Sequence, residues 1–205
     1  MNKLPHQERS LVLLKPDAVQ RSLIGEVVGR FERVGLKVAA MKMVMATEEQ
    51  LITHYNKTDE WYERKGKGIV ADMEAHKIPV TKEPIEYGKD IIRNMVKYMT
   101  AAPVVAIVLE GNQSVAVVTK LVGTTEPSTS DVGTIRGDYT LDSYSHATIE
   151  NRGVRNLIHC SESPAEAERE MAIWFTDGEM MKYATAQERI CLLYTSPSPR
   201  DRQKS

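Results

Sequence analysis

Cysteine is scarce in this sequence, and its scarcity limits the kinds of site that the chain can build. Only Cys160 and Cys191 occur among 205 residues. Two cysteines are too few for a disulfide framework or for a zinc site made of thiolates. Glycine-rich phosphate loops of the Gly-x-x-x-x-Gly-Lys-Ser/Thr and Gly-x-Gly-x-x-Gly types are absent as well. Any phosphate group that the protein binds must therefore be held by side chains.

Long apolar runs and an excess of charge are also missing. The longest apolar run, Ala101–Leu109, is about half of the ~20 residues that a membrane-spanning helix needs, and residues 1–10 lack the apolar core of a signal peptide. Lys and Arg number 27 against 28 Asp and Glu, a formal net charge of -1. This balance argues against binding nucleic acid or an anionic membrane through bulk charge. With 41% apolar residues, we expect a soluble, cytoplasmic, globular protein.

The hydrophobic pattern predicts strands and helices in alternation, with no internal repeat. Strands are expected at about 11–14, 36–44, 103–109 and 154–159, and helices at about 24–34, 48–55, 91–99, 112–122 and 164–174. Thr47 with Gln50, and Ser163 with Glu166, stand at capping-box spacing before two of these helices. Gly35 follows another at the place where a left-handed residue commonly ends a helix.

Two stretches depart from this alternation, and the end of the chain differs in kind. Residues 56–89 are charged and interrupted by glycines and prolines, so we expect an elaborated surface segment. Residues 123–138 are dense in Gly, Thr, Ser, Pro and Asp, which predicts a long loop, and such loops inside a compact domain are usually functional. Residues 191–205 contain repeated Ser-Pro pairs and are expected to be disordered and foreign to the fold.

Two basic residues stand where they could hold a phosphate. Lys15 ends the first predicted strand, where its side chain can project into a crevice at the edge of a sheet. Arg136 lies between Gly133 and Asp138, where flanking glycines let the backbone place a guanidinium tightly. Taken alone, a strand-end lysine is more often a solvated residue than a ligand.

The sharpest local signal is the segment Asn156–Ser163. His159 ends the last predicted strand just before a capped helix, close to an electropositive helix N-terminus. A neutral imidazole is a competent nucleophile when an acceptor on its other nitrogen defines the tautomer. A lone histidine is more often structural. Cys160 is expected to face away from His159, because adjacent strand residues point to opposite faces, and the histidines lack the spacing of a metal site.

Taken together, these residues resemble a known family. Four motifs stand in the order in which nucleoside diphosphate kinases carry them: Lys15-Pro16-Asp17, His54-Tyr55, Gly133-Thr134-Ile135-Arg136-Gly137-Asp138 and Asn156-x-x-His159-x-Ser161. The resemblance covers about residues 8–183. It implies an α+β, ferredoxin-like βαββαβ sandwich with a four-stranded antiparallel sheet. Residues 1–190 would form one such domain with insertions at about 56–89 and 139–153, followed by the tail 191–205.

The resemblance also implies an enzyme, a phosphotransferase that moves the γ-phosphoryl of a nucleoside triphosphate such as ATP to a nucleoside diphosphate. The reaction is ping-pong and passes through a phosphohistidine on His159, supported by Ser161 and Glu170. Mg²⁺ enters with the nucleotide, and the family forms homo-oligomers, either hexamers or tetramers. The substrate-binding residues implied by the resemblance are Lys15, Tyr55, Thr125, Arg136 and Asn156.

Some positions depart from the family pattern. Thr119 stands where the family usually has a phosphate-binding arginine, and Lys120 is one residue out of register. Aliphatic residues near Ile91 replace the aromatic that stacks on the base, so Trp61 or Tyr62 of the first insertion could cover it instead. These departures keep an alternative open, a catalytically weakened nucleotide-binding or assembly protein on the same fold. A nucleic-acid-binding module is disfavoured, because both phenylalanines lie in predicted helices and the charge is balanced.

Overall fold

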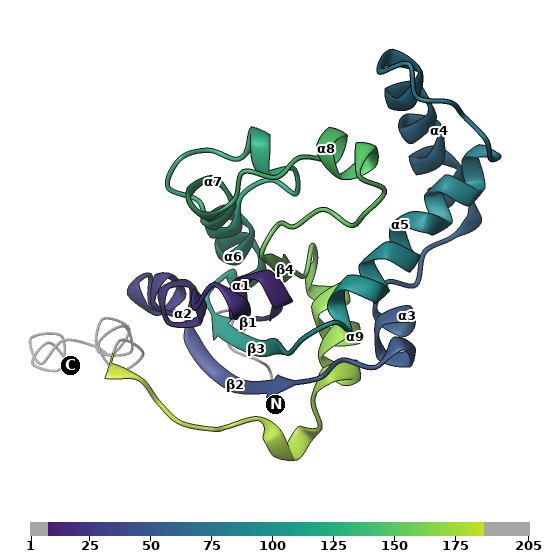
Figure 1. Ribbon diagram of the computed structural model, residues 1–205. Helices are drawn as coiled ribbons and strands as arrows, with labels where there is room; N and C mark the ends of the chain where they lie inside the picture. The colour runs from purple at the N-terminus through teal and green to yellow at the C-terminus, as the bar shows by residue number, and fades with distance from the viewer. Residues whose placement is uncertain (1–7, 187–205) are drawn as a thin grey trace, which may run out of the picture.

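The computed structural model describes residues 8–186, which build a four-stranded antiparallel sheet with helices on both faces (Figure 1). The strands are β1 (Glu8–Leu14), β2 (Lys37–Val44), β3 (Val104–Gly111) and β4 (Ile158–Cys160). Their order in the sheet is β2-β3-β1-β4, and every neighbouring pair is antiparallel. This is the ferredoxin-like topology, so the predicted fold class is confirmed. The predicted tail, 191–205, lies outside the described residues.

Strand β1 is apolar on both of its faces because helices cover both. Val12 and Leu14 join one hydrophobic cluster, and Leu11 and Leu13 join the cluster on the opposite face. All four side chains are fully buried. A strand buried on both faces reads as a continuous apolar run rather than as an alternation, which is why these four residues were recognisable in the sequence.

The helices divide between the two clusters. On the face of Val12 the core receives side chains from α1 (Pro16–Gln20), α2 (Ile24–Arg33), α6 (Ser114–Val122) and α7 (Ile135–Tyr139). On the face of Leu13 it receives them from α3 (Glu48–His54), α5 (Pro84–Met99) and α9 (Pro164–Trp174). The remaining elements are α4 (Asp59–Ala75), α8 (Tyr144–Ile149) and two short 3₁₀ segments, Pro127–Thr129 and Asp177–Glu179. None of the helices within residues 8–186 is both long and apolar enough to cross a bilayer.

The predicted caps form, with one difference. Thr47 and Gln50 make a reciprocal capping box at α3, and the Ser163 side chain accepts the Glu166 N–H at α9. The Glu166 carboxylate, however, accepts the N–H of Glu162 rather than that of the cap residue. It therefore ties the loop after β4 to the first turn of α9.

Three predicted segments differ in the structure. Residues 56–89, predicted as an elaborated surface segment, form α4 and the start of α5, and the predicted loop 123–138 contains the start of α7, which the Thr134 side chain caps. The strand predicted at 154–159 begins only at Ile158. The strand starts late because Leu157 has a left-handed backbone, with φ of 65°, and its N–H is bonded to Asp17 instead of a neighbouring strand.

Helices α4 and α5 leave the sheet together and extend beyond the other helices (Figure 1). They cross closely at two glycines. A Cβ atom at Gly66 would lie 1.6 Å from the backbone oxygen of Pro84, and one at Gly88 would lie 2.0 Å from that of Tyr62. The crossing therefore requires glycine at both positions. The same glycines interrupt the sequence pattern, which explains why α4 and the first part of α5 were not predicted, whereas a helix at 91–99 was.

We expect Gly66→Ala and Gly68→Ala to change stability in opposite directions. Alanine at position 66 collides with backbone and should destabilise the protein by about 1–3 kcal/mol. At Gly68, on the same helix, a Cβ atom meets nothing within 4 Å, so alanine should stabilise by up to about 1 kcal/mol through helix propensity. Thermal unfolding followed by circular dichroism measures both. Equal shifts in the two variants would contradict the close crossing.

Candidate active site

Strand β4 and helix α9 bring His159 and Glu170 together. His159 Nε2 lies 3.0 Å from Glu170 Oε2, and the Ser161 hydroxyl donates to the same carboxylate oxygen over 2.8 Å. Because an ionised carboxylate only accepts hydrogen bonds, the hydrogen of the His159 ring lies on Nε2. In the neutral ring, the lone pair is then on Nδ1.

The environment of Glu170 keeps it ionised. Its side chain is buried, and burial alone would raise its pKa. The hydrogen bond and charge of His159, with the hydroxyl of Ser161, outweigh burial and lower the pKa of Glu170 to about 2. Glu170 is therefore an acceptor for His159 over the whole neutral range of pH.

Local pairing sets the position of this group of residues. His159 stands opposite Leu13 in the β4–β1 pair. Two residues later, the backbone N–H of Ser161 donates to Leu11 O over 3.1 Å, and Leu11 N donates to the Ser161 hydroxyl over 3.3 Å. Ser161 thus links the edge of the sheet to the carboxylate that orients His159.

Cys160 faces the other side of the sheet, as predicted. It packs against the cluster that contains Leu14, whereas the ring of His159 lies against that of His54. Burial raises the pKa of the Cys160 thiol, so it is a packing residue without thiolate character.

Lys15 and Asn156 form a buried pair next to this site. Lys15 Nζ donates to Asn156 Oδ1 over 2.6 Å, and Asn156 Nδ2 donates to the backbone oxygen of Thr125 over 2.9 Å. Lys15 is only 3% exposed. Burial, with a contribution from the charge of Arg136, lowers the pKa of Lys15 to about 7. An ammonium held in this way gains strongly from a nearby anion.

Arg136 is aligned by backbone oxygens on three sides. Its guanidinium donates to Asn156 O, Gly123 O and Ile158 O over 3.2, 3.0 and 2.6 Å. Ile158 directly precedes His159, and the charge of Arg136 also acts on Tyr55, whose ring neighbours that of His159. Burial lowers the pKa of Arg136, yet an arginine remains charged in proteins.

A strained turn at Leu157 connects Asn156, which binds both Lys15 and Arg136, to the start of β4. Leu157 has a left-handed backbone with φ of 65°, a conformation that is uncommon for a residue other than glycine. Asp17 Oδ2 accepts its N–H over 3.2 Å, and Lys15 N donates to its carbonyl over 2.8 Å. The segment at Lys15–Asp17 thereby holds the turn that places Asn156 and His159 on neighbouring sides of the site.

Tyr55 and His54 complete the surroundings of the His159 ring. Their ring centroids lie 5.9 and 4.4 Å from that of His159. The Tyr55 hydroxyl is buried without a hydrogen-bond partner among the described residues, and burial raises its pKa. It is therefore a protonated donor directed into the site.

The structure unites most of the predicted site residues and leaves others apart. His159, Glu170, Ser161 and Tyr55 form one group, and Lys15, Arg136, Asn156 and the carbonyl of Thr125 form an adjoining one. Lys120 is exposed on α6, and no hydrogen bond or ion pair within residues 8–186 joins it to either group. Ile91 is half-buried on α5, and its role stays a prediction.

Sequence reasoning missed two residues of this site. His54 and Asp17 each stand in one of the family motifs, but neither was given a role in the site. Both positions depend on contacts between distant segments, Asp17 with Leu157 and His54 with Trp174. The only signal in the sequence was their place beside Lys15 and Tyr55.

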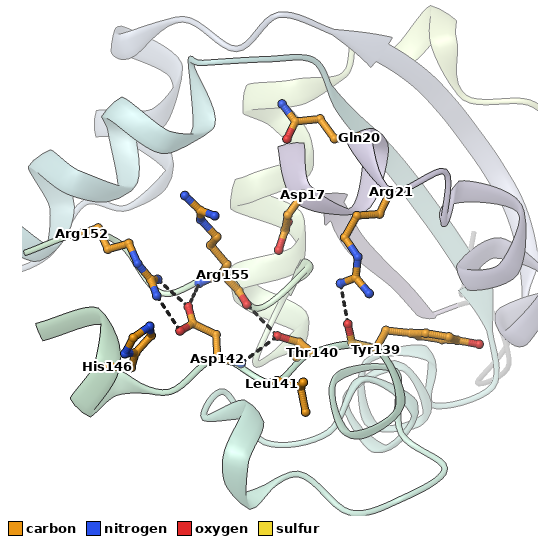
Figure 2. A pocket seen from close by; sticks show the side chains of 10 residues that line it. All are labelled: Asp17, Gln20, Arg21, Tyr139, Thr140, Leu141, Asp142, His146, Arg152 and Arg155. Carbon is orange, nitrogen blue, oxygen red and sulfur yellow. Dashed lines mark hydrogen bonds and ion pairs between the residues drawn. The ribbon is translucent and has the colours of Figure 1, made fainter. Parts of the chain in front are cut away.

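A hollow of about 560 Å³ lies between residues 17–21 and residues 139–155 (Figure 2). Its lining residues are Asp17, Gln20, Arg21, Tyr139, Thr140, Leu141, Asp142, His146, Arg152 and Arg155. The Arg155 side chain extends between Arg152 and Asp17 (Figure 2). His159 and Glu170 do not line this hollow, which shares Asp17 with the candidate active site.

The fold and the site together define a class of protein. A ferredoxin-like sheet carries an oriented imidazole, and two buried cations lie next to it. Such an arrangement can accept an anionic group on Nδ1 while neutralising its charge.

Comparison with known proteins identifies the family. A family model described as "Nucleoside diphosphate kinase" matches residues 8–73 and 84–180. The nucleoside diphosphate kinase of Pyrobaculum aerophilum is 45% identical over 180 residues, which cover 85% of this chain and 98% of that protein. That of Archaeoglobus fulgidus is 38% identical over 181 residues, covering 88% and 95%. The chain belongs to the nucleoside diphosphate kinase family.

Solved structures agree. A crystal structure of an NDP kinase from Pyrobaculum aerophilum superposes with a TM-score of 0.81 at 44% identity and covers 86% of this chain and all of that one, 100%. A nucleoside-diphosphate kinase from Borrelia burgdorferi, described as a transition state mimic with bound vanadate and ADP, superposes with a TM-score of 0.72 at 35% identity and covers 89% of this chain and 95% of that one.

Replacing Lys15 should reveal how strongly its buried charge opposes folding. Its pKa is about 7 in the folded protein against an ordinary 10.5, so the unfolded chain holds the proton more tightly. The buried ammonium therefore destabilises the unliganded protein fully below pH ~7 and less as pH rises toward 10.5. We expect Lys15→Met to raise Tm near pH 6 and to lose most of that gain near pH 10. A gain that is the same at both pH values would contradict the buried charge.

Proposed function

We propose that this protein is a nucleoside diphosphate kinase that works through a phosphohistidine on His159. A nucleoside triphosphate such as ATP passes its γ-phosphoryl to Nδ1, and a nucleoside diphosphate then takes it from the same atom. The observation that carries the proposal is the bond between His159 Nε2 and Glu170. It assigns the ring hydrogen to Nε2 and leaves Nδ1 as the nucleophile.

The cations beside the ring suit this reaction. Phosphoryl transfer requires in-line positioning and neutralisation of charge on the equatorial oxygens. Lys15 and Arg136 would supply that charge, and Tyr55 would donate to a phosphoryl oxygen. Asn156 holds Lys15 in place through its amide oxygen, and Thr125 would contact the diphosphate. These roles follow the family motifs and the positions of the side chains.

The choice of an imidazole fits an exchange between nucleotides. A P–N bond to imidazole retains much of the energy of a phosphoanhydride, so both half-reactions run close to thermoneutral. A serine nucleophile would form a far more stable ester and would stall. Donor and acceptor share a base, a sugar and a diphosphate, so one pocket serves both.

We further propose that Mg²⁺ is carried in by the nucleotide. The described groups that face the phosphate are donors: an ammonium, a guanidinium and a tyrosine hydroxyl. Glu170 is already bonded to His159 and Ser161. This donor set fits a metal held by phosphate oxygens rather than by a protein cage. When bound, Mg²⁺ would neutralise phosphate charge, a task that it would share with Lys15 and Arg136.

Homo-oligomeric assembly, as a hexamer or tetramer, is part of the proposal. Strand β2 lies at an edge of the sheet. Met41, Met43 and the adjoining Met45 are each more than half exposed, at 53%, 55% and 55%. An exposed apolar edge of this kind commonly pairs with another chain. We also propose one cytoplasmic catalytic domain over residues 1–190, with insertions at about 56–89 and 139–153.

A weakened, nucleotide-binding protein is the second candidate. Thr119 favours it, because the family's usual arginine at this position would add a positive charge. The Thr119 hydroxyl donates to Val115 O in its own helix. Against this candidate, His159, Glu170 and Ser161 are connected as the reaction requires.

Labelling with γ-³²P-ATP in the absence of acceptor tests the proposed function. We expect an acid-labile, alkali-stable phosphoprotein that GDP discharges. His159→Ala should abolish the label, whereas Cys160→Ala should keep it, because Cys160 lies on the other face of the sheet. Label that persists in His159→Ala would overturn the assignment of the nucleophile. An unlabelled wild-type protein would favour the second candidate.

Thr119→Arg tests the missing positive charge. We expect it to lower the KM for nucleoside diphosphate several-fold and to relax the dependence on Mg²⁺, because a guanidinium there would take over part of the neutralisation. Lys120→Arg is the matched control, since it changes a neighbouring exposed residue without adding charge. No gain in nucleotide affinity for Thr119→Arg would count against the missing-charge hypothesis.

A further inference from the structure

His54 has a buried polar atom that the fold does not use. The residue ends α3 and is only 1% exposed. Its ring lies 4.4 Å from that of His159, centroid to centroid, at an interplanar angle of 78°. Nε2 of His54 has no hydrogen-bond partner among the residues that the structure describes. An unpaired buried polar group lowers the stability of the folded protein. A histidine at position 54 therefore needs a functional explanation.

The contact with Trp174 determines the tautomer of His54. The indole Nε1 lies 3.3 Å from His54 Nδ1. An indole nitrogen can only donate, so Nδ1 accepts and the hydrogen of the neutral ring is on Nε2. Burial, followed by the charge of His159, lowers the pKa of His54 to about 3. The unpartnered atom is thus an N–H donor on a neutral ring.

This tautomer excludes a metal site at a cluster that otherwise has the composition of one. His54, His159 and Glu170 offer ligand atoms that all lie within 4.8 Å of one another. A metal needs a nitrogen lone pair. At His54, Trp174 occupies the lone pair on Nδ1, and Nε2 is protonated. At His159, the nitrogen next to Glu170 also carries its hydrogen. Of the three groups, only His54 therefore has a hydrogen-bond donor that is unused within residues 8–186, whereas Nδ1 of His159 keeps its lone pair.

The acceptor that fits is an oxyanion attached to His159. The Tyr55 hydroxyl is a second buried donor without a partner, and the His54 and Tyr55 rings are 4.6 Å apart. Two neighbouring preorganised donors beside a nucleophile are the arrangement that stabilises charge developing on oxygen. Ligand atoms of His54, His159 and Glu170 lie within 4.8 Å of one another, so the His54 donor borders the group that carries the nucleophile.

We propose that His54 is a further catalytic residue, whose Nε2–H donates a hydrogen bond to a phosphoryl oxygen during transfer to and from His159. The inference rests on the proposed function. As the P–Nδ1 bond forms, the P–O bond to the leaving nucleoside diphosphate breaks and that oxygen keeps the electron pair. His54 holds its proton throughout. It serves both half-reactions equally, because its charge does not change.

Two substitutions at position 54 separate a donor from a packing residue. His54→Phe keeps a flat ring and removes the N–H, whereas His54→Gln keeps an N–H donor and removes the ring. Single-turnover labelling by ATP and discharge by GDP are measured for both. We expect His54→Phe to slow both steps on the order of 100-fold and His54→Gln to retain most of the rate. The reverse order, with His54→Phe faster than His54→Gln, would show a packing role and overturn the proposal.

A measurement on the wild-type protein keeps the test independent of folding in the variants. The ¹H resonance of His54 Nε2–H is followed by NMR before and after phosphorylation. We expect a downfield shift on phosphorylation, because the donor gains an acceptor. An unchanged resonance on a fully phosphorylated protein overturns the role of His54 alone. Failure of the wild-type protein to accept any label defeats the proposed function instead.

Discussion

The hydrogen bond from His159 to Glu170 is the interaction on which the rest of the site depends. It assigns the ring hydrogen to Nε2, and only that assignment makes Nδ1 a nucleophile. The bond exists because β4 pairs with β1 and because Ser161 connects the end of β4 to both the sheet and the carboxylate. The antiparallel sheet and the N-cap of α9 thus bring His159 and Glu170 together.

A second constraint is the burial of positive charge with little to balance it. Lys15 is held by an amide oxygen and Arg136 by backbone carbonyls, so both cations have lost water and are hydrogen-bonded to neutral groups. The left-handed backbone at Leu157 adds strain at the same place. Both features disfavour the empty protein and favour a bound polyphosphate. The surrounding core, with both sheet faces covered, supplies the stability that this arrangement requires.

Local signals in the sequence predicted much of the fold and the reacting group. The apolar run of β1, the caps at Thr47 and Ser163, and the His159–Ser161 motif each depend on near neighbours, and the structure contains all of them. The predictions failed where contacts between distant segments of the chain determine the structure. Gly66 reads as a helix breaker until α5 lies against it. The position of His54 depends on Trp174, 120 residues later in the chain, and no local pattern encodes that contact.

Nitrogen-resolved NMR of His159 tests the central claim most directly. Long-range ¹H–¹⁵N spectra report which ring nitrogen carries hydrogen, and ³¹P–¹⁵N coupling after treatment with ATP reports which one is bonded to phosphorus. With Glu170 as the acceptor, hydrogen should be on Nε2 of the neutral ring and phosphorus on Nδ1. Hydrogen on Nδ1 of the free protein, or phosphorus on Nε2, would contradict the account.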